Sequence, residues 1–230
     1  MEKPSTQDSI LKILKGKSSM KQDVYEKTVK AFVMMRTVAY EIVRDIKANP
    51  DLTDKRVIVE YRERGEFEFE IRISGDLLIF GMHTNIFEFD KSHLIWKGSY
   101  LKEDPSRSFC GMINVYNFLN DSFKYHRIND LGYLIGRIFI NKESHYFVEG
   151  KRQLGFLHND FNHATLDEKA VREVLESIIL HCLNFDLYTP PFDSIREITV
   201  SEMQAASESM QIQTGKRLGF RFQADSDEIK

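Results

Sequence analysis

The chain has 230 residues, of which 42% are hydrophobic and 12% aromatic. This length and composition suffice to bury a full hydrophobic core, which excludes an intrinsically disordered chain and a small disulfide-stapled domain. Its 32 Lys and Arg residues against 35 Asp and Glu residues give a net charge of −3, so no global positive field attracts nucleic acid or an anionic membrane.

Residues 1–19 form a polar N-terminal arm with one short amphipathic pattern. The stretch SILKILKG, from Ser9 to Gly16, predicts a short helix that Gly16 closes. The arm has no apolar stretch of signal-peptide length, and no later window approaches the length of a membrane span. We therefore expect a cytoplasmic protein without a membrane partner, whose two cysteines, Cys110 and Cys182, are reduced and buried.

A long helix is predicted from Met20 to about Ala48, ending before Pro50. One apolar stripe is enough to dock a helix on a sheet, and this helix has two. The second stripe predicts burial against another helix or against a second copy of the protein. The first stripe contains Val24, Thr28, Ala31, Met35, Val38 and Ile42, and the second, a candidate dimer or packing surface, contains Tyr25, Val29, Phe32, Ala39, Val43 and Ile46.

Three strands are predicted next, in RVIVEYRERGEFEFEIRIS and LLIFGM. In the first stretch apolar residues alternate with charged ones, which predicts two strands joined by a turn at Glu63 to Gly65. LLIFGM is apolar on both faces, so we expect a central strand that is covered on both sides.

A middle helix is predicted in SRSFCGMINVYNFLNDSFKY, because Met112, Val115, Tyr116, Leu119 and Phe123 fit a 3.6-residue period. A second meander follows in YLIGRIFI, HYFV and QLGFL. Thr165 and Glu168 predict a capping box for a last helix. We therefore expect an α+β core domain over residues 20–192, in which three helices pack on an antiparallel sheet of two meanders. Residues 193–230 form a C-terminal extension, read as a short strand, a small helix and the hairpin SMQIQTGKRLGFRFQ or a mobile tail.

This element order, with Asn117 and Asn120 leading from the middle helix into the next strand, resembles the YbjN and type III secretion chaperone-like superfamily. The resemblance covers roughly residues 20–185, and the chain departs from it in the N-terminal helix, the strand QLGFL and the C-terminal extension. It implies a dimeric protein-interaction or regulatory module with no catalytic residues to carry over. GAF-like ligand sensors also fit this element order.

Two groups of residues near the second meander have the chemistry of an active site. Glu149 and Lys151 form a Glu-x-Lys pair, but a metal-dependent nuclease also needs a second carboxylate, and strand register places Asp130 too far from Glu149. His158, Asp160 and His163 have ligand types that suit zinc or manganese. The alternative is that Asp160 and Asn162 only cap or turn the chain before the helix at Thr165.

The second meander is apolar on both faces, so helices, a second subunit or a ligand must cover both. In this prediction Ile140 pairs with His145, and Glu149 pairs with Gly136. One face then holds Ile138, Ile140, His145, Phe147, Leu154 and Phe156, and the other, a candidate binding surface, holds Tyr133, Ile135, Phe139, Tyr146 and Val148.

Near the C-terminus TGKRLGFRFQ interleaves basic residues with Phe220 and Phe222, a mixture that can contact nucleic acid. An edge hairpin with outward charges explains the pattern more simply in a protein of net negative charge. We therefore predict a non-enzymatic, homodimeric interaction or regulatory module, chaperone-like or sensor-like, without a cofactor. The alternatives are a metal-assisted hydrolase that uses His158, Asp160 and His163, and a small-ligand sensor with an aromatic pocket.

Overall fold

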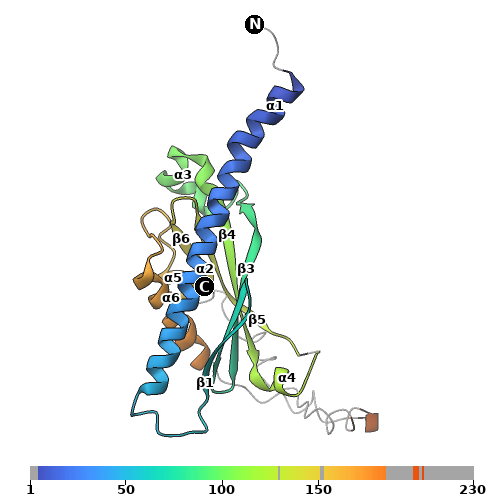
Figure 1. The fold of residues 1–230 in the computed structure, drawn as a ribbon, viewed down its shortest axis with the longest axis vertical. Helices are drawn as coiled ribbons and strands as arrows, with labels where there is room; N and C mark the ends of the chain where they lie inside the picture. Colours follow the sequence, from blue (N-terminus) through green and yellow to red (C-terminus); the bar gives the residue numbers. More distant parts are fainter. Residues whose placement is uncertain (1–4, 129, 151–152, 185–198, 202–203, 205–230) are drawn as a thin grey trace, which may run out of the picture.

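The computed structural model describes residues 5–128, 130–150, 153–184, 199–201 and 204. It has the expected α+β fold, in which an antiparallel sheet of six strands carries a long N-terminal helix and a C-terminal helix on one face (Figure 1). The strands follow one another in sequence order, from β1 (Val59–Gly65), β2 (Glu68–Ile73) and β3 (Asp76–Glu88) to β4 (Phe109–Leu119), β5 (Tyr133–Asn141) and β6 (Tyr146–Gly150).

The N-terminal helix is continuous from Thr6 to Ala48 and consists of α1 (Thr6–Ile13), a π-helical turn η1 (Leu14–Ser18) and α2 (Ser19–Ala48). A capping box between Ser5 and Asp8 starts it. The prediction that Gly16 closes a separate helix is wrong, because the chain passes through Gly16 in a widened turn. The helix ends at Asn49, whose extended backbone precedes Pro50 as expected.

The predicted middle helix is wrong, because residues 109–119 form strand β4 between β3 and β5. Ile113 and Val115 face the helices, whereas Cys110 and Met112 pack on the opposite face of the sheet. A central strand that is apolar on both faces imitates the spacing of a helix. The last part of the predicted segment is α-helical, in α4 (Asn120–Lys124).

The stretch QLGFL is also helical rather than extended, in α5 (Gln153–Leu157). Leu154 is buried in the core, but Phe156 is 78% exposed. The last described long helix is α6 (Glu168–Leu183), and its N-cap is Asp167 in place of the predicted Thr165. The Asp167 carboxylate accepts a hydrogen bond from the Ala170 amide at 2.8 Å.

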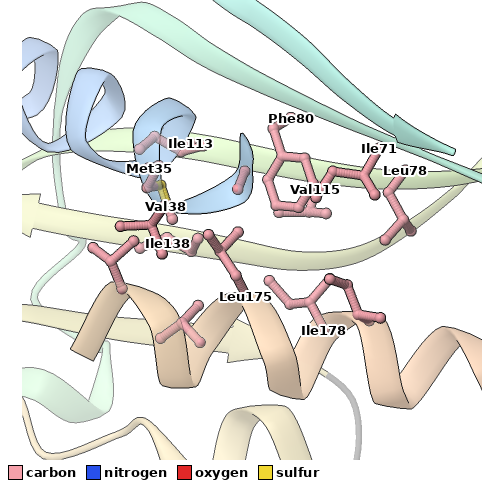
Figure 2. Packing of buried hydrophobic residues seen from close by; sticks show 14 of the residues in the cluster. Met35, Val38, Ile71, Leu78, Phe80, Ile113, Val115, Ile138, Leu175 and Ile178 are labelled. Carbon is pink, nitrogen blue, oxygen red and sulfur yellow. The ribbon is translucent and has the colours of Figure 1, made fainter. Parts of the chain in front are cut away.

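The main core lies between the sheet and the two long helices α2 and α6 (Figure 2). Met35 and Val38 from α2 and Leu175 and Ile178 from α6 belong to this one cluster, in which the two helices also contact each other. Burying an aliphatic side chain of this size contributes about 1.5–3 kcal/mol, so this layer is the main source of stability. The sheet side of the layer includes Ile71, Leu78, Phe80, Ile113, Val115 and Ile138.

A second, smaller core covers one end of the opposite face of the sheet, which we call the outer face. The chain between β3 and β4 folds over it in η2 (Leu94–Lys97), α3 (Ser99–Glu103) and η3 (Pro105–Ser108). Its buried residues are Tyr100, Leu101, Cys110, Phe139, Phe147 and Phe161. Cys110 and Cys182 are both buried and free, as predicted.

Helix α2 and strand β4 approach closely at one point. Thr28 is fully buried, and its hydroxyl donates a hydrogen bond to the Val24 carbonyl at 2.8 Å. Its side chain lies against Gly111, where any Cβ would overlap the Thr28 hydroxyl and methyl groups. Glycine is therefore required at this position of β4.

Candidate functional site

The predicted metal ligands do not converge. His158 is buried, and its Nε2 lies 3.4 Å from the Ser177 hydroxyl of α6, whereas His163 and Asp160 form an exposed pair at 3.0 Å. No group of three metal-ligating side chains occurs in the part of the chain that the structure describes. Burial lowers the pKa of His158, which keeps its ring neutral inside the protein.

In the described part of the chain, Glu149 and Asp130 have different hydrogen-bond partners. Glu149 accepts a hydrogen bond from Arg137 Nε at 2.6 Å across β5 and β6. Asp130 instead accepts a hydrogen bond from the Ser122 hydroxyl at 2.6 Å. Lys151 lies outside the described residues.

The predicted binding surface on the second meander is wrong, because the register of β5 and β6 differs by one residue from the predicted one. Ile140 pairs with Tyr146, and Gly136 pairs with Gly150. A one-residue shift exchanges the two faces of a strand. Tyr146 and Val148 are consequently buried in the main core, whereas Phe139 points to the outer face. Ile135 is also buried in the main core, with Tyr133 packed beside the cluster, because a bulge at Ile135 opposite β4 shifts the alternation within β5.

The second apolar stripe of α2 also belongs to the main core. Phe32, Ala39 and Val43 are buried, and Tyr25 and Val29 pack at the margin of the same cluster. The sheet and α6 cover the helix on two sides, which confirms the first of the two predicted partners, another helix. The buried members of this stripe, Phe32, Ala39 and Val43, are therefore not available to a second copy.

A polar cluster around Tyr100 fixes the segment between β3 and β4, which covers the outer face, to the turn between β5 and β6. The Tyr100 ring is stacked on His145 with 4.4 Å between ring centres, and the Arg107 guanidinium lies 4.2 Å from the centre of the Tyr100 ring. Its hydroxyl donates to Glu143 at 2.8 Å and accepts from Asn141 Nδ2 at 2.9 Å. Burial, the largest cause, raises the pKa of Tyr100, so the phenol stays protonated and serves as a structural hydrogen-bonding group.

Within the described ranges, two surfaces of the molecule expose apolar side chains without a partner. The first is the helical part of the N-terminal segment, residues 6–18, and from here on "the arm" means these residues. It extends beyond the end of the sheet (Figure 1). Spacings of three and four place its aliphatic side chains together on one side. These side chains are Ile10, Leu11, Ile13 and Leu14, which are 43–58% exposed.

Charged residues on the arm and on the first turns of α2 have opposite signs and the same spacing. Lys12 and Lys15 are three residues apart on the arm, and Asp23 and Glu26 are three residues apart on α2. All four side chains are exposed, and none forms an ion pair with another described residue. Beside them, Lys21, Tyr25 and Ile86 contribute to the lining of a hollow of about 620 Å³.

The second such surface is the free edge of β1, which has no strand beside it among the described residues. A groove of about 660 Å³ runs between this edge and α2. Val33 and Tyr40 line it from α2 and are each 54% exposed, and Tyr61 lines it from β1 with its ring 5.9 Å from that of Tyr40. At its end Arg36 binds Glu63 at 2.7 Å.

The sequence contains no signal for either surface that could be read without the fold. Ile10 and Leu14 are visible as an amphipathic pattern, but their exposure depends on where the sheet ends. Val33 and Tyr40 lie outside both predicted stripes of the long helix.

No protein-family model matches the chain, and neither a curated protein nor a solved structure matches it. Within the described part of the chain, no helix combines the length and the apolar character that crossing a bilayer requires.

Proposed function

We propose that this protein is a homodimeric, non-enzymatic interaction module whose two copies meet through the N-terminal arm. The observation that carries the proposal is the exposure of Ile10, Leu11, Ile13 and Leu14 on a helix that extends past the sheet. A contiguous apolar patch of this kind is typical of a protein–protein contact. The amphipathic arm then uses helix-on-helix packing, with polar residues at its rim.

The charges favour an antiparallel arrangement of two copies about an axis near Ser19. Lys12 then lies opposite Glu26 of the second copy, and Lys15 lies opposite Asp23. Opposite charges at matched positions fix the register and the orientation of a helix pair more than they add affinity. In this register Ile13 faces Tyr25 of the second copy, beside the hollow at α2 and β3.

The small residues at the proposed crossing point support a close approach of the two helices. Gly16, Ser18 and Ser19 lie within three residues of the axis. A Cβ at Gly16 would meet no atom of its own chain, so this side of the turn is open to a neighbour. Helix axes pack about 8–10 Å apart depending on the side chains at the contact, and small side chains allow the shorter distances.

Sedimentation equilibrium across a range of concentrations tests the proposal. The unchanged protein should sediment as a dimer, and Ile10→Asp with Leu14→Asp should sediment as a monomer with unchanged far-ultraviolet circular dichroism. Two charges on the apolar face remove its burial on both copies. The dissociation constant of the dimer should therefore increase at least about a hundredfold. A monomeric unchanged protein at micromolar concentration would contradict the proposal.

A charge exchange tests the register independently of the apolar face. Lys12→Glu with Lys15→Glu should weaken the dimer by placing like charges opposite each other, and adding Asp23→Lys with Glu26→Lys should restore it. The matched control is Lys47→Glu with Lys55→Glu, which changes two exposed lysines away from the arm. Failure of the fourfold variant to recover would reject the antiparallel register.

A further inference from the structure

The free edge of β1 and the groove beside it have the features of a site for an extended segment. The backbone of an edge strand offers unpaired N–H and C=O groups to a further strand. The inner side of the groove is apolar through Val33, Tyr40 and Tyr61. On the outer face, Glu60 lies within 3.5 and 3.6 Å of the guanidinium groups of Arg62 and Arg72, so one carboxylate serves two cations.

We propose that the C-terminal segment Arg217–Phe222, which lies outside the described residues, adds to this edge as a seventh strand. Its sequence alternates apolar residues with glycine or arginine, which is the pattern of a strand with one buried face. The three apolar residues are Leu218, Phe220 and Phe222. This inference is independent of the proposed dimer.

Side-chain chemistry selects one antiparallel register. Placing Phe220 opposite Tyr61 forms an aromatic pair over the groove, and it places Phe222 opposite the buried Val59. The same register sets Arg221 opposite Glu60. Cross-strand aromatic and opposite-charge pairs of this kind each contribute about 0.2–1 kcal/mol, and together they distinguish one register from its neighbours.

Another residue of β1 on the outer face, Arg62, is also compatible with the antiparallel register. Gly219 lies opposite Arg62 and leaves its side chain undisturbed. A parallel strand with Phe220 beside Tyr61 would bring Arg221 next to Arg62, and like charges at adjacent positions are unfavourable. The segment therefore runs antiparallel to β1.

The length of the chain allows its own segment to reach the edge. The last residue of the continuous described core is Asn184, and 32 residues lie between it and Arg217 in sequence. An extended chain spans up to about 3.3 Å per residue, far more than the width of this sheet. A tethered segment also has an effective concentration on the order of millimolar, which favours it over a second copy.

Disulfide trapping in the full chain tests the register. The variant Glu60→Cys with Arg221→Cys should form an intramolecular disulfide under mild oxidation, because directly paired residues lie within about 4.5–5.5 Å between Cα atoms. The control, Arg62→Cys with Arg221→Cys, is displaced by two positions and should react at least about tenfold more slowly. Both native cysteines are buried and do not compete.

Mass spectrometry of the non-reduced protein separates the outcomes. An internal disulfide in the first variant but not in the control supports the proposal. Equal rates in the two variants overturn it, as does a disulfide that joins two chains, which would assign the edge to a second copy.

Hydrogen exchange gives a second measurement that does not depend on cysteine. Phe220→Asp with Phe222→Asp should speed exchange in peptides from β1 by about tenfold or more, because strand hydrogen bonds are lost at the edge. Peptides from the central strand β4 should keep their protection. The matched control is Gln211→Asp with Gln213→Asp, which adds the same charge without removing an apolar residue. Unchanged exchange in β1 would overturn the proposal.

Discussion

The two edges of the sheet end in different ways. At β6 the chain itself covers the edge, because the Val148 amide donates to the His158 carbonyl at 2.7 Å and the Tyr146 amide donates to the Ala164 carbonyl at 3.1 Å. At β1 no described segment runs alongside, and charged side chains line the strand. Among the described residues, one edge is closed by backbone hydrogen bonds, and the other is lined by charged side chains without a paired segment.

This difference explains what residues 158–165 do. The histidines and aspartate that suggest a metal site belong to the segment that closes β6 and leads into α6. His145 pairs with Thr165 in antiparallel fashion, and the Leu166 amide donates to the Ser144 carbonyl at 2.9 Å. Polar residues near a strand edge can therefore serve the backbone rather than a ligand.

The largest expected change in stability comes from truncating Phe161, the buried aromatic residue in the segment that covers β6. Phe161 is 5% exposed in the outer core, so Phe161→Ala should lower the free energy of unfolding by about 3–5 kcal/mol in urea denaturation. Hydrogen exchange should rise at β6 well before it rises at β1. The control Phe156→Ala removes a ring that is 78% exposed and should change stability by less than about 0.5 kcal/mol.

A smaller loss is expected when the turn beside the closed edge loses one hydroxyl. Tyr100→Phe leaves Asn141 Nδ2 without its acceptor in a buried position, which should cost about 1–3 kcal/mol. Urea denaturation measures it. An unchanged midpoint would show that water replaces the hydroxyl.

Acid should loosen the closed edge through His158. Burial, the first cause, lowers its folded pKa below the usual 6.5, and Glu173 opposes the shift. As the pH falls through 6.5 the unfolded state takes up this proton more readily than the folded one, so stability decreases. His158→Gln should flatten the dependence of unfolding free energy on pH between 7 and 5, a range set by that ordinary value. An unchanged slope would contradict the assignment.

The smallest effect is expected at the open edge. Arg36→Met removes the ion pair with Glu63, whose side chain is 61% exposed, and should cost less than about 1 kcal/mol. Urea denaturation in low and high salt measures the difference. The control Arg44→Met removes a pair in which both side chains are more than half exposed, and a larger loss there would reverse the expected order.

Much of the fold follows from the sequence because periodicity reports which faces are buried. The stripes of the long helix identified its buried faces, and the doubly apolar LLIFGM matched a central strand in which Leu77 and Ile79 are buried on the outer face. Burial on both faces is also the reason why β4 is wrongly predicted to be a helix. Periodicity cannot distinguish a strand covered on both faces from a helix in the core.

The register of β5 and β6 depends on side-chain hydrogen bonds that a pattern does not contain. Asn141 accepts bonds from the amides of Glu143 and His145 at 2.9 and 3.0 Å, which closes a three-residue loop, Lys142 to Ser144. Ser144 has a φ of 63°, a conformation that sequence patterns rarely indicate for serine. Because the loop has an odd length, the faces of the strand exchange relative to a two- or four-residue turn.

The contact between Thr28 and Gly111 fixes the position of the long helix along strand β4. Sliding α2 along β4 by one position would bring the Thr28 side chain against a residue that has a Cβ, so the contact acts as a stop in both directions. The arm is a continuation of this helix. The direction in which the arm points is therefore fixed by a contact in the core. A change at Gly111 would redirect the arm without altering any residue on it.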